Sequence, residues 1–202
     1  QFDIFMILQT KNQLFTPKNG DQVKSIECDK AFKKMDLKKY IRSIPDYPKK
    51  GILYRDITTL IKDNQAFKYT VDKMAEMTID INFDKVIGIE SRGFVFASAV
   101  AYKLSKPLIL IRKKNKLPAK KYSEDFELEY GKATIEIHKD SIKKNEKVII
   151  IDDLIATGGT AKAAARLVKK SSGKIESFIF VINLYDIGGK DLLEKESYKT
   201  LS

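Results

Sequence analysis

Apolar residues recur along the chain in short runs separated by polar segments, as in proteins that alternate strands and helices. Continuous apolar runs predict strands buried on both faces of a parallel sheet, at residues 85–89, 108–111, 148–151 and 175–184. Helical spacing of apolar positions predicts helices at residues 36–44, 64–77, 94–104 and 161–169. This alternation predicts one α/β domain over residues 35–202, with an open, mostly parallel sheet flanked by helices.

Three segments depart from the alternation. Residues 52–56 form a short extended piece after two prolines. Residues 117–130 have no apolar periodicity, and a polar loop of that length inside a compact domain is often a functional lid. Apolar and polar residues alternate over 133–138, which predicts a half-exposed strand. The single histidine, His138, falls on the polar phase of that strand, so we expect it at the surface rather than in a site.

The first 34 residues mix polar and charged side chains without a clear period, which predicts an extension outside the core. The apolar patch at 2–8 is short and lacks the basic front of a signal peptide. No apolar run approaches the length of a membrane span, so no membrane partner is expected. Cys28 is the only cysteine, which excludes a disulfide framework and makes a reducing cytoplasm the default location.

The net charge is +11 at pH 7 and is carried almost wholly by lysine. Such an excess fits either nucleic acid or a small polyanionic substrate. The lysines are scattered through every segment, and aromatic residues are not interleaved with them as a stacking platform would need. We therefore expect a solvated basic surface and no nucleic-acid partner.

Arginine is more informative because the chain has only five. Its planar guanidinium binds phosphate through two hydrogen bonds at once. Arg55, Arg92 and Arg112 each fall just after a strand-like run, which makes them candidate phosphate ligands. Arg42 and Arg166 lie in helical patterns and are predicted to be ordinary surface residues.

Two adjacent acids, Asp152 and Asp153, follow the apolar run 148–151, so we expect both to be exposed at a strand end. Paired carboxylates are suited to accepting hydrogen bonds from the vicinal hydroxyls of a sugar. Two acids at a strand end are also common in plain solvated turns, and the residues that follow decide between these interpretations.

Those residues form a turn that predicts a phosphate site. Gly158 and Gly159 let the backbone bend without a Cβ clash, and Thr160 is expected to cap the next helix. Backbone N–H groups and the positive end of the helix dipole then face the turn, with the Thr157 hydroxyl beside them. There is no lysine in the turn, which excludes the Walker-type nucleotide loop.

Together, residues 148–161 resemble the 5-phosphoribosyl 1-diphosphate (PRPP) motif of the type I phosphoribosyltransferases. Further matching stretches occur in family order, at 41–48, 54–57, 90–93, 111–113 with 116–118, and 128–132. The likeness covers roughly residues 35–190 and is most specific for the adenine-using members of the family.

The resemblance implies a pentosyl transfer in purine salvage, in which adenine and PRPP give AMP and diphosphate. It also implies a small hood over the sheet, a flexible lid loop, a homodimer, and Mg²⁺ as a cofactor held mainly by substrate oxygens. In the family, the turn equivalent to residues 90–93 contains a cis peptide bond, here Glu90–Ser91.

The resemblance further assigns the site residues. Ribose and 5-phosphate would lie on Asp152, Asp153, Ala156, Thr157, Gly158, Gly159 and Thr160. The diphosphate would lie on Ser91, Arg92, Arg112, Lys113 and Lys116, partly from the neighbouring subunit. Adenine would contact Leu53, Tyr54, Arg55 and Leu184. Catalysis is assigned to Glu129 and Tyr130 on the lid, together with Arg92.

Two positions indicate which purine base the chain uses. Family members that use 6-oxopurines carry an acid where this chain has Ala156, which favours adenine. The adenine-using members commonly have an acid where this chain has Asn183, so a base contact from that position is not carried over. Two alternatives stay open: a phosphoribosyltransferase for another purine, and a PRPP-sensing regulatory protein. The regulator needs neither a lid acid nor an arginine in the diphosphate loop, and this chain has Glu129 and Arg92.

Overall fold

A seven-stranded sheet forms the centre of the computed structural model, which describes residues 35–128 and 131–202. Its strand order is β5-β6-β4-β3-β7-β8-β9. The five strands β4, β3, β7, β8 and β9 are parallel, and β6 and β5 add an antiparallel edge. The strands are β3 (Lys85–Ile89), β4 (Leu108–Lys113), β5 (Lys121–Leu128), β6 (Gly131–His138), β7 (Lys147–Ile155), β8 (Lys174–Asn183) and β9 (Thr200–Leu201). The predicted fold class is confirmed.

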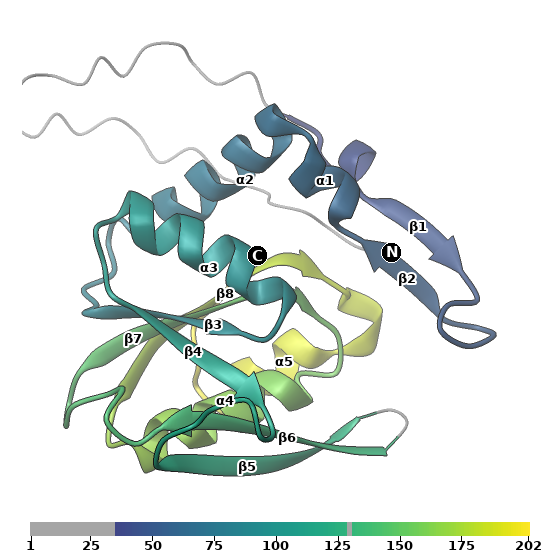
Figure 1. The fold of residues 1–202 in the computed structure, drawn as a ribbon. Coiled ribbons are helices and arrows are strands. Elements are labelled where there is room, and N and C mark those ends of the chain that lie inside the picture. Colours follow the sequence, from purple (N-terminus) through teal and green to yellow (C-terminus); the bar gives the residue numbers. More distant parts are fainter. Residues whose placement is uncertain (1–34, 129–130) are drawn as a thin grey trace, which may run out of the picture.

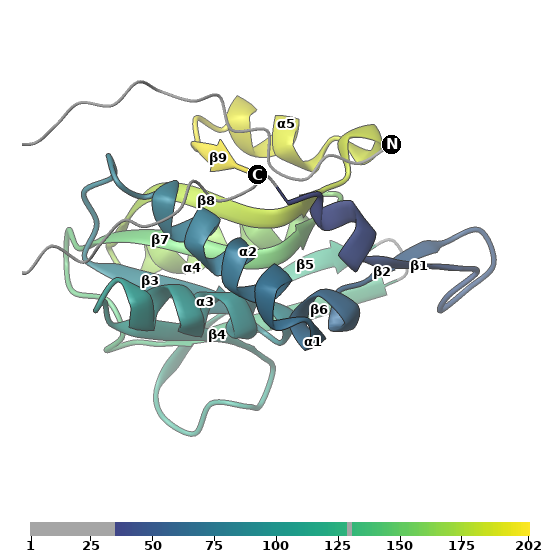
Figure 2. The same cartoon turned by 90° about the horizontal axis from the view of Figure 1, so that it is seen from above.

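Helices cover both faces of the sheet (Figures 1 and 2). On one face lie α1 (Thr58–Lys62), α2 (Asn64–Glu76) and α3 (Arg92–Lys103); on the other lies α4 (Gly159–Lys170), with α5 (Gly189–Lys195) beside it. The run 148–151 explains this layering, because its alternate side chains point to opposite faces. Ile149 and Ile151 pack in the core with α2 and α3, whereas Val148 and Ile150 pack with α4. No helix in the described part of the chain has the length and apolarity needed to cross a membrane.

The predicted helix over 36–44 is wrong. A short 3-10 helix, η1 (Leu37–Tyr40), is followed by β1 (Arg42–Pro45), which pairs antiparallel with β2 (Leu53–Asp56). This two-stranded hairpin forms the hood at one end of the sheet (Figure 2). Pairing with β2 overrides the local helical spacing, since Arg42 lies opposite Asp56 in the register.

Arg42 is exposed, as predicted, but it lies on β1 rather than in a helix and its guanidinium makes a structural contact. Its Nε donates to the buried Asp56 carboxylate at 3.0 Å, and the Thr58 N–H donates to the same carboxylate at 2.9 Å. The hydrogen bond from Arg42, followed by that from Thr58, lowers the pKa of Asp56 to about 2. This ionised carboxylate joins the hood to the start of α1.

The predicted polar loop over 117–130 is wrong over most of its length. Residues 121–128 form β5, which pairs with β6 from Lys121 opposite His138 to Leu128 opposite Gly131. Tyr122 and Phe126 pack against the core on the α4 side of the sheet. Between them, Glu124 contacts Arg166 at 2.7 Å and Lys170 at 2.5 Å, both on α4. Because the charged Glu124 lies between Tyr122 and Phe126 on the inward-facing side of β5, the sequence does not show the apolar–polar alternation of a strand.

That contact also corrects the prediction for Arg166, which lies on a helix as expected but is not an ordinary surface residue. Its Nε donates to Glu124, and its Nη2 donates to the Asp125 carbonyl at 3.0 Å. His138, expected at the surface, is half-buried at the end of β6, where its Nε2 accepts from the Ala119 N–H at 3.4 Å.

Candidate functional site

A cavity of about 1030 Å³ opens at the carboxyl ends of β3, β7 and β8, next to the hood. Ligands of open α/β sheets bind at this edge. Most of the predicted site residues line the cavity: Leu53, Tyr54, Arg55, Ser91, Arg92, Lys113, Asp152, Asp153, Ala156, Thr157, Gly158, Gly159, Thr160 and Leu184. Arg112 and Lys116 are described but do not line it. Glu129 and Tyr130 lie outside the described residues.

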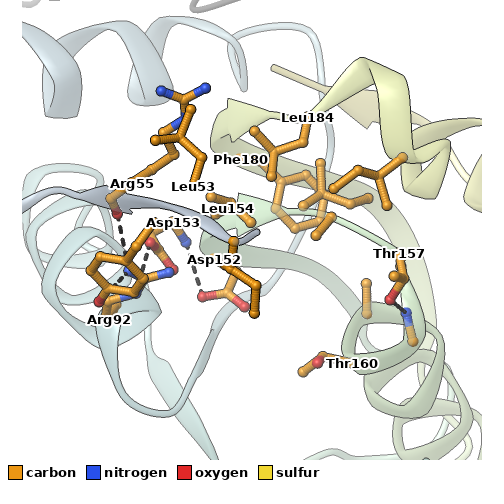
Figure 3. A pocket seen from close by; sticks show the side chains of 18 of the residues that line it. Leu53, Arg55, Arg92, Asp152, Asp153, Leu154, Thr157, Thr160, Phe180 and Leu184 are labelled. Atoms are coloured by element: carbon orange, nitrogen blue, oxygen red, sulfur yellow. Dashed lines mark hydrogen bonds and ion pairs between the residues drawn. The ribbon is translucent and has the colours of Figure 1, made fainter. Parts of the chain in front are cut away.

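The two acids occupy the middle of the site, with Arg92 on one side and the turn bearing Thr157 and Thr160 on the other (Figure 3). They are not exposed at a strand end as expected, because β7 continues past them to Ile155. Asp153 is only 4% exposed, and its Oδ2 lies 2.9 Å from Nε of Arg92. Asp152 is half-buried, and its Oδ1 accepts from the Asp153 N–H at 2.9 Å.

Burial and the adjacent charge of Asp153 raise the pKa of Asp152 well above the ordinary value. Burial also raises the pKa of Asp153, against the opposing pull of Arg92. The unliganded site therefore holds two carboxyl groups that would each gain from hydrogen-bond donors. Vicinal sugar hydroxyls supply such donors.

The turn before α3 lies directly against the acids. A Cβ added to Gly93 would lie 2.6 Å from Oδ1 of Asp152 and 2.9 Å from the Ile151 carbonyl, so only glycine fits there. The Glu90–Ser91 peptide bond is cis, which confirms the expectation drawn from the resemblance. Ser91 then precedes α3 and faces the cavity.

Arg92 connects the hood to the acids. Its Nη1 donates to the Tyr54 hydroxyl at 2.9 Å and to the Arg55 carbonyl at 3.3 Å. The guanidinium also lies 5.2 Å from the centre of the Tyr54 ring, close enough for a cation–π contact. With its Nε paired to Asp153, Arg92 sits between the hood and the sugar-binding acids.

The phosphate turn differs from its prediction in how the helix begins. Gly158 is the N-cap of α4 in a left-handed conformation, with φ at 80°, and Thr160 lies inside the first helical turn rather than capping it. Glycine alone takes this conformation without strain, and it aims the first-turn N–H groups, which have no intrahelical acceptors, at the turn. The Glu127 carbonyl lies 3.1 Å from the position of an added Cβ at Gly159, so the end of β5 reaches this turn.

The two basic residues at the end of β4, Arg112 and Lys113, make different contacts. Glu90 accepts from Nε of Arg112 at 3.2 Å, from its Nη2 at 3.3 Å, and from the Lys113 N–H at 2.8 Å. Although burial opposes it, these donors hold the pKa of Glu90 below its ordinary value. Arg112 thus orders the strand end through Glu90, while Lys113 lines the cavity.

An apolar wall was missed by the sequence analysis. Besides the predicted Leu53 and Leu184, it contains Leu154 and Phe180 (Figure 3). Ile155 and Ile187 also line the cavity. Leu154 and Ile155 lie beyond the predicted strand 148–151, whereas Phe180 has the pattern of a core residue in the predicted strand 175–184. Their position near the carboxyl ends of β7 and β8 was the available signal. Asn183 does not line the cavity; it is 1% exposed, and its amide has no hydrogen-bond partner within the described ranges.

The donor set for a metal ion is small. In the described part of the chain, no group of three or more His, Cys, Asp or Glu side chains is placed to hold one. The cavity does present the Asp152 and Asp153 carboxylates. One or two carboxylates combined with substrate phosphates are the usual environment of Mg²⁺.

Comparisons with known proteins agree with this geometry. A family model described as "Phosphoribosyl transferase domain" matches residues 58–201. The adenine phosphoribosyltransferase of Pelagibacter ubique is 66% identical over 165 residues, which span 82% of this chain and 94% of that protein. That of Brachyspira hyodysenteriae is 53% identical over 161 residues, covering 80% and 95% of the two chains.

Solved structures extend the likeness to the backbone. The adenine phosphoribosyltransferase of Thermoanaerobacter pseudethanolicus superposes with a TM-score of 0.78 at 41% identity, over 81% of this chain and 94% of that one. The Saccharomyces cerevisiae enzyme, solved with an imino-altritol bisphosphate and adenine, gives a TM-score of 0.75 at 32% identity, over 82% and 94%. The chain therefore belongs to the phosphoribosyltransferase family, within its adenine phosphoribosyltransferase branch.

Proposed function

We propose that the chain transfers the 5-phosphoribosyl group of PRPP to adenine, giving AMP and diphosphate in purine salvage. One observation carries the proposal: a single cavity joins a carboxylate pair, a phosphate turn and an apolar wall. These three parts match the sugar hydroxyls, the 5-phosphate and the purine ring of the proposed substrates.

Each part of the cavity has a binding role in this proposal. The N–H groups of the first turn of α4 and the Thr157 and Thr160 hydroxyls bind the 5-phosphate. Asp152 and Asp153 accept from the ribose 2′- and 3′-hydroxyls. The purine lies against Leu53 and Leu184, with backbone groups of 53–55 at its edge. The leaving diphosphate lies near Ser91, Arg92 and Lys113.

The chemistry follows from the charge that develops. The bond at the anomeric carbon breaks through an oxocarbenium-like state, as in glycoside hydrolysis. Asp152 and Asp153 place negative charge beside the ribose as it becomes positive, and Arg92 and Lys113 place positive charge where the diphosphate leaves. Ground-state binding of PRPP and the reaction step therefore use the same residues.

Mg²⁺ fits the site as a substrate-borne ion. Asp152 and Asp153 are the side chains that would reach it, either directly or through the sugar hydroxyls, with PRPP oxygens completing its shell. When bound, Mg²⁺ would neutralise part of the diphosphate charge.

The proton transfer to or from the purine is assigned to Glu129, with Tyr130 beside it, on the resemblance alone. Both residues lie outside the described ranges. The Glu127 carbonyl, near the end of β5, reaches Gly159 of the phosphate turn, so β5 ends beside the proposed phosphate site.

Adenine is the expected base because Ala156 offers no carboxylate to the N7 edge of a 6-oxopurine. We expect AMP formation from adenine and PRPP, and a kcat/KM for hypoxanthine, guanine or xanthine at least about 10²-fold lower, the discrimination that a few purine contacts provide. Chromatographic separation of the nucleotide products for each base tests this. Comparable kcat/KM for adenine and hypoxanthine would contradict the assignment of the base.

The homodimer is also part of the proposal. Three exposed apolar side chains support it: Tyr102 on α3, and Leu108 and Leu110 on β4, with exposed fractions of 89%, 38% and 38%. Leu108 and Leu110 alternate along β4 and so share one face of the sheet. A second copy covering this patch would remove the apolar side chains from water. Equilibrium sedimentation should then give twice the 23.1 kDa chain mass, and a single chain mass at micromolar concentration would contradict the dimer.

A further inference from the structure

Glu136 is a buried carboxylate on β6 that lies outside the cavity. It is 3% exposed, and it is opposite Arg112 in one pairing register and opposite Ser123 in the other. Its neighbours along the strand, Ile135 and Ile137, are core residues. A charged side chain at such a position is retained only when nearby groups satisfy it, because burying a charge is unfavourable.

The partners of Glu136 are the two ends of one loop. Residues 114–120 connect β4 to β5 and project from the body of the protein (Figure 2). At the start of the loop, the Asn115 N–H donates to Oε2 of Glu136 at 3.0 Å. At its end, Nζ of Lys121 lies 2.9 Å from the same oxygen. The Ser123 hydroxyl donates to Oε1 at 3.3 Å, so both carboxylate oxygens are used.

Two further features tie the conformation of the 114–120 loop to the residues at its ends. Asn115 has a left-handed backbone, with φ at 65°, which reverses the chain just after β4. Nζ of Lys121 also donates to the Leu117 carbonyl at 3.2 Å, inside the loop. Despite the penalty of burial, hydrogen bonds from Lys121 and Asn115 hold the pKa of Glu136 below its ordinary value. The group is therefore an anion at neutral pH, bound to both ends of the loop.

We propose that Glu136 is a positioning residue for the diphosphate of PRPP: by joining both ends of the 114–120 loop it holds Lys113 at the cavity and sets the direction of Lys116. The inference rests on the proposed function, in which Lys113 meets the diphosphate. Glu90 fixes the same segment from the other side through Arg112 and the Lys113 N–H. Glu136, which lies outside the cavity, and Glu90, which lines it, thus fix the segment that carries Lys113 from two sides.

A purely structural role for Glu136 makes a different prediction. Replacing a buried ion pair often changes stability without changing a remote site. Glu146 provides the matched control, because it also binds one lysine and one backbone N–H: Lys85 at 2.8 Å and Lys143 N at 2.7 Å. Glu146 immediately precedes β7, and Asp152 and Asp153 lie near the carboxyl end of that strand. Glu146 is therefore at the end of the strands that is opposite to the cavity.

The test compares Glu136→Gln with Glu146→Gln. We expect the KM for PRPP and the dissociation constant of PRPP, measured by titration calorimetry, to rise roughly tenfold in Glu136→Gln, within the range known for misplaced binding groups. The KM for adenine should change little. Amide hydrogen exchange of peptides covering 113–120 should accelerate in Glu136→Gln only. Glu146→Gln should keep the parental PRPP affinity while losing comparable thermal stability.

Parental PRPP affinity in a folded Glu136→Gln, or an equal loss in Glu146→Gln, would overturn the inference. If Glu136→Gln does not fold, Lys121→Met detaches only the far end of the loop and should raise the KM for PRPP in the same direction; unchanged KM there would overturn it as well. Failure of the proposed function looks different, since the parental chain itself would then form no AMP from adenine and PRPP.

Discussion

Asp152→Asn is expected to make the unliganded protein more stable while it removes most of its activity. The activity loss, roughly 10²–10³-fold in kcat/KM for PRPP, combines a lost charged hydrogen bond to the ribose with lost electrostatic stabilisation of the developing cation. The amide keeps the Oδ1 acceptor for the Asp153 N–H, so the strand should persist. Steady-state kinetics and thermal unfolding, followed on the same samples, measure the two effects.

The stability gain has a definite pH dependence. The pKa of Asp152 is raised in the folded protein, chiefly by burial and then by the charge of Asp153. The folded state therefore holds this proton more tightly than the unfolded chain, and stability falls as the pH rises past the ordinary pKa of an aspartate. Asp152→Asn should remove that fall, so its gain in melting temperature should be present at pH 7 and vanish near pH 3.

Asp84→Asn is the control for this prediction, because Asp84 accepts from the Lys147 N–H at 2.8 Å at the opposite end of the sheet. Its kcat/KM should match the parent. An Asp152→Asn variant with parental affinity for PRPP would contradict the ribose assignment, and one that is destabilised at pH 7 would contradict the electrostatic account of the site.

Arg92→Lys is expected to lower kcat/KM by roughly 10²-fold, because a single ammonium cannot replace the groups that the guanidinium holds together. Arg92 pairs with Asp153, donates to the Tyr54 hydroxyl and the Arg55 carbonyl, and lies against the Tyr54 ring. Without the guanidinium, the hood should be held less tightly and the negative charge of Asp153 should be less well neutralised. The KM for adenine should therefore rise together with the KM for PRPP.

Arg166→Lys tests whether this effect is specific to the site. Arg166 also binds one carboxylate and one carbonyl, those of Glu124 and Asp125, but it does so outside the cavity. Its kcat/KM should stay within about twofold of the parent, as for most substitutions away from a site. Equal losses in the two variants would mean that arginine bonding stabilises the fold generally rather than the site.

The central sheet was predictable because its signal is local. The run 148–151 is apolar on both faces, and burial between helices is the only arrangement that such a strand favours. The hood was expected from the resemblance, but its strand β1 and the strand β5 were missed because their structure depends on distant partners. Arg42 pairs with Asp56 in β2, and Glu124 pairs with Arg166 and Lys170 in α4. No window of sequence around Arg42 or Glu124 contains these partners.

The site, like the fold, was predictable only where its signal is local in the sequence. Polar residues after strands were found because ligands gather at the carboxyl ends of parallel strands. The apolar wall was not, since Phe180 has the same local pattern as any core residue. The burial of Asp153 was also missed, because the extension of β7 beyond the acids depends on pairing with β8 as far as Asn183. Local sequence patterns therefore identified the polar residues of the site, whereas the burial of Asp153 depends on pairing between strands that are distant in sequence.

A crystal structure of the complex with AMP tests the central claim most directly, since AMP carries the phosphate, the sugar and the base in one molecule. We expect the 5′-phosphate on the backbone N–H groups of 158–160, the ribose hydroxyls on Asp152 and Asp153, and the adenine against Leu184 beneath the hood. A reversed orientation, with the phosphate at Lys113 and the base at the turn before α4, would contradict the assignment of the cavity. So would a nucleotide bound outside it.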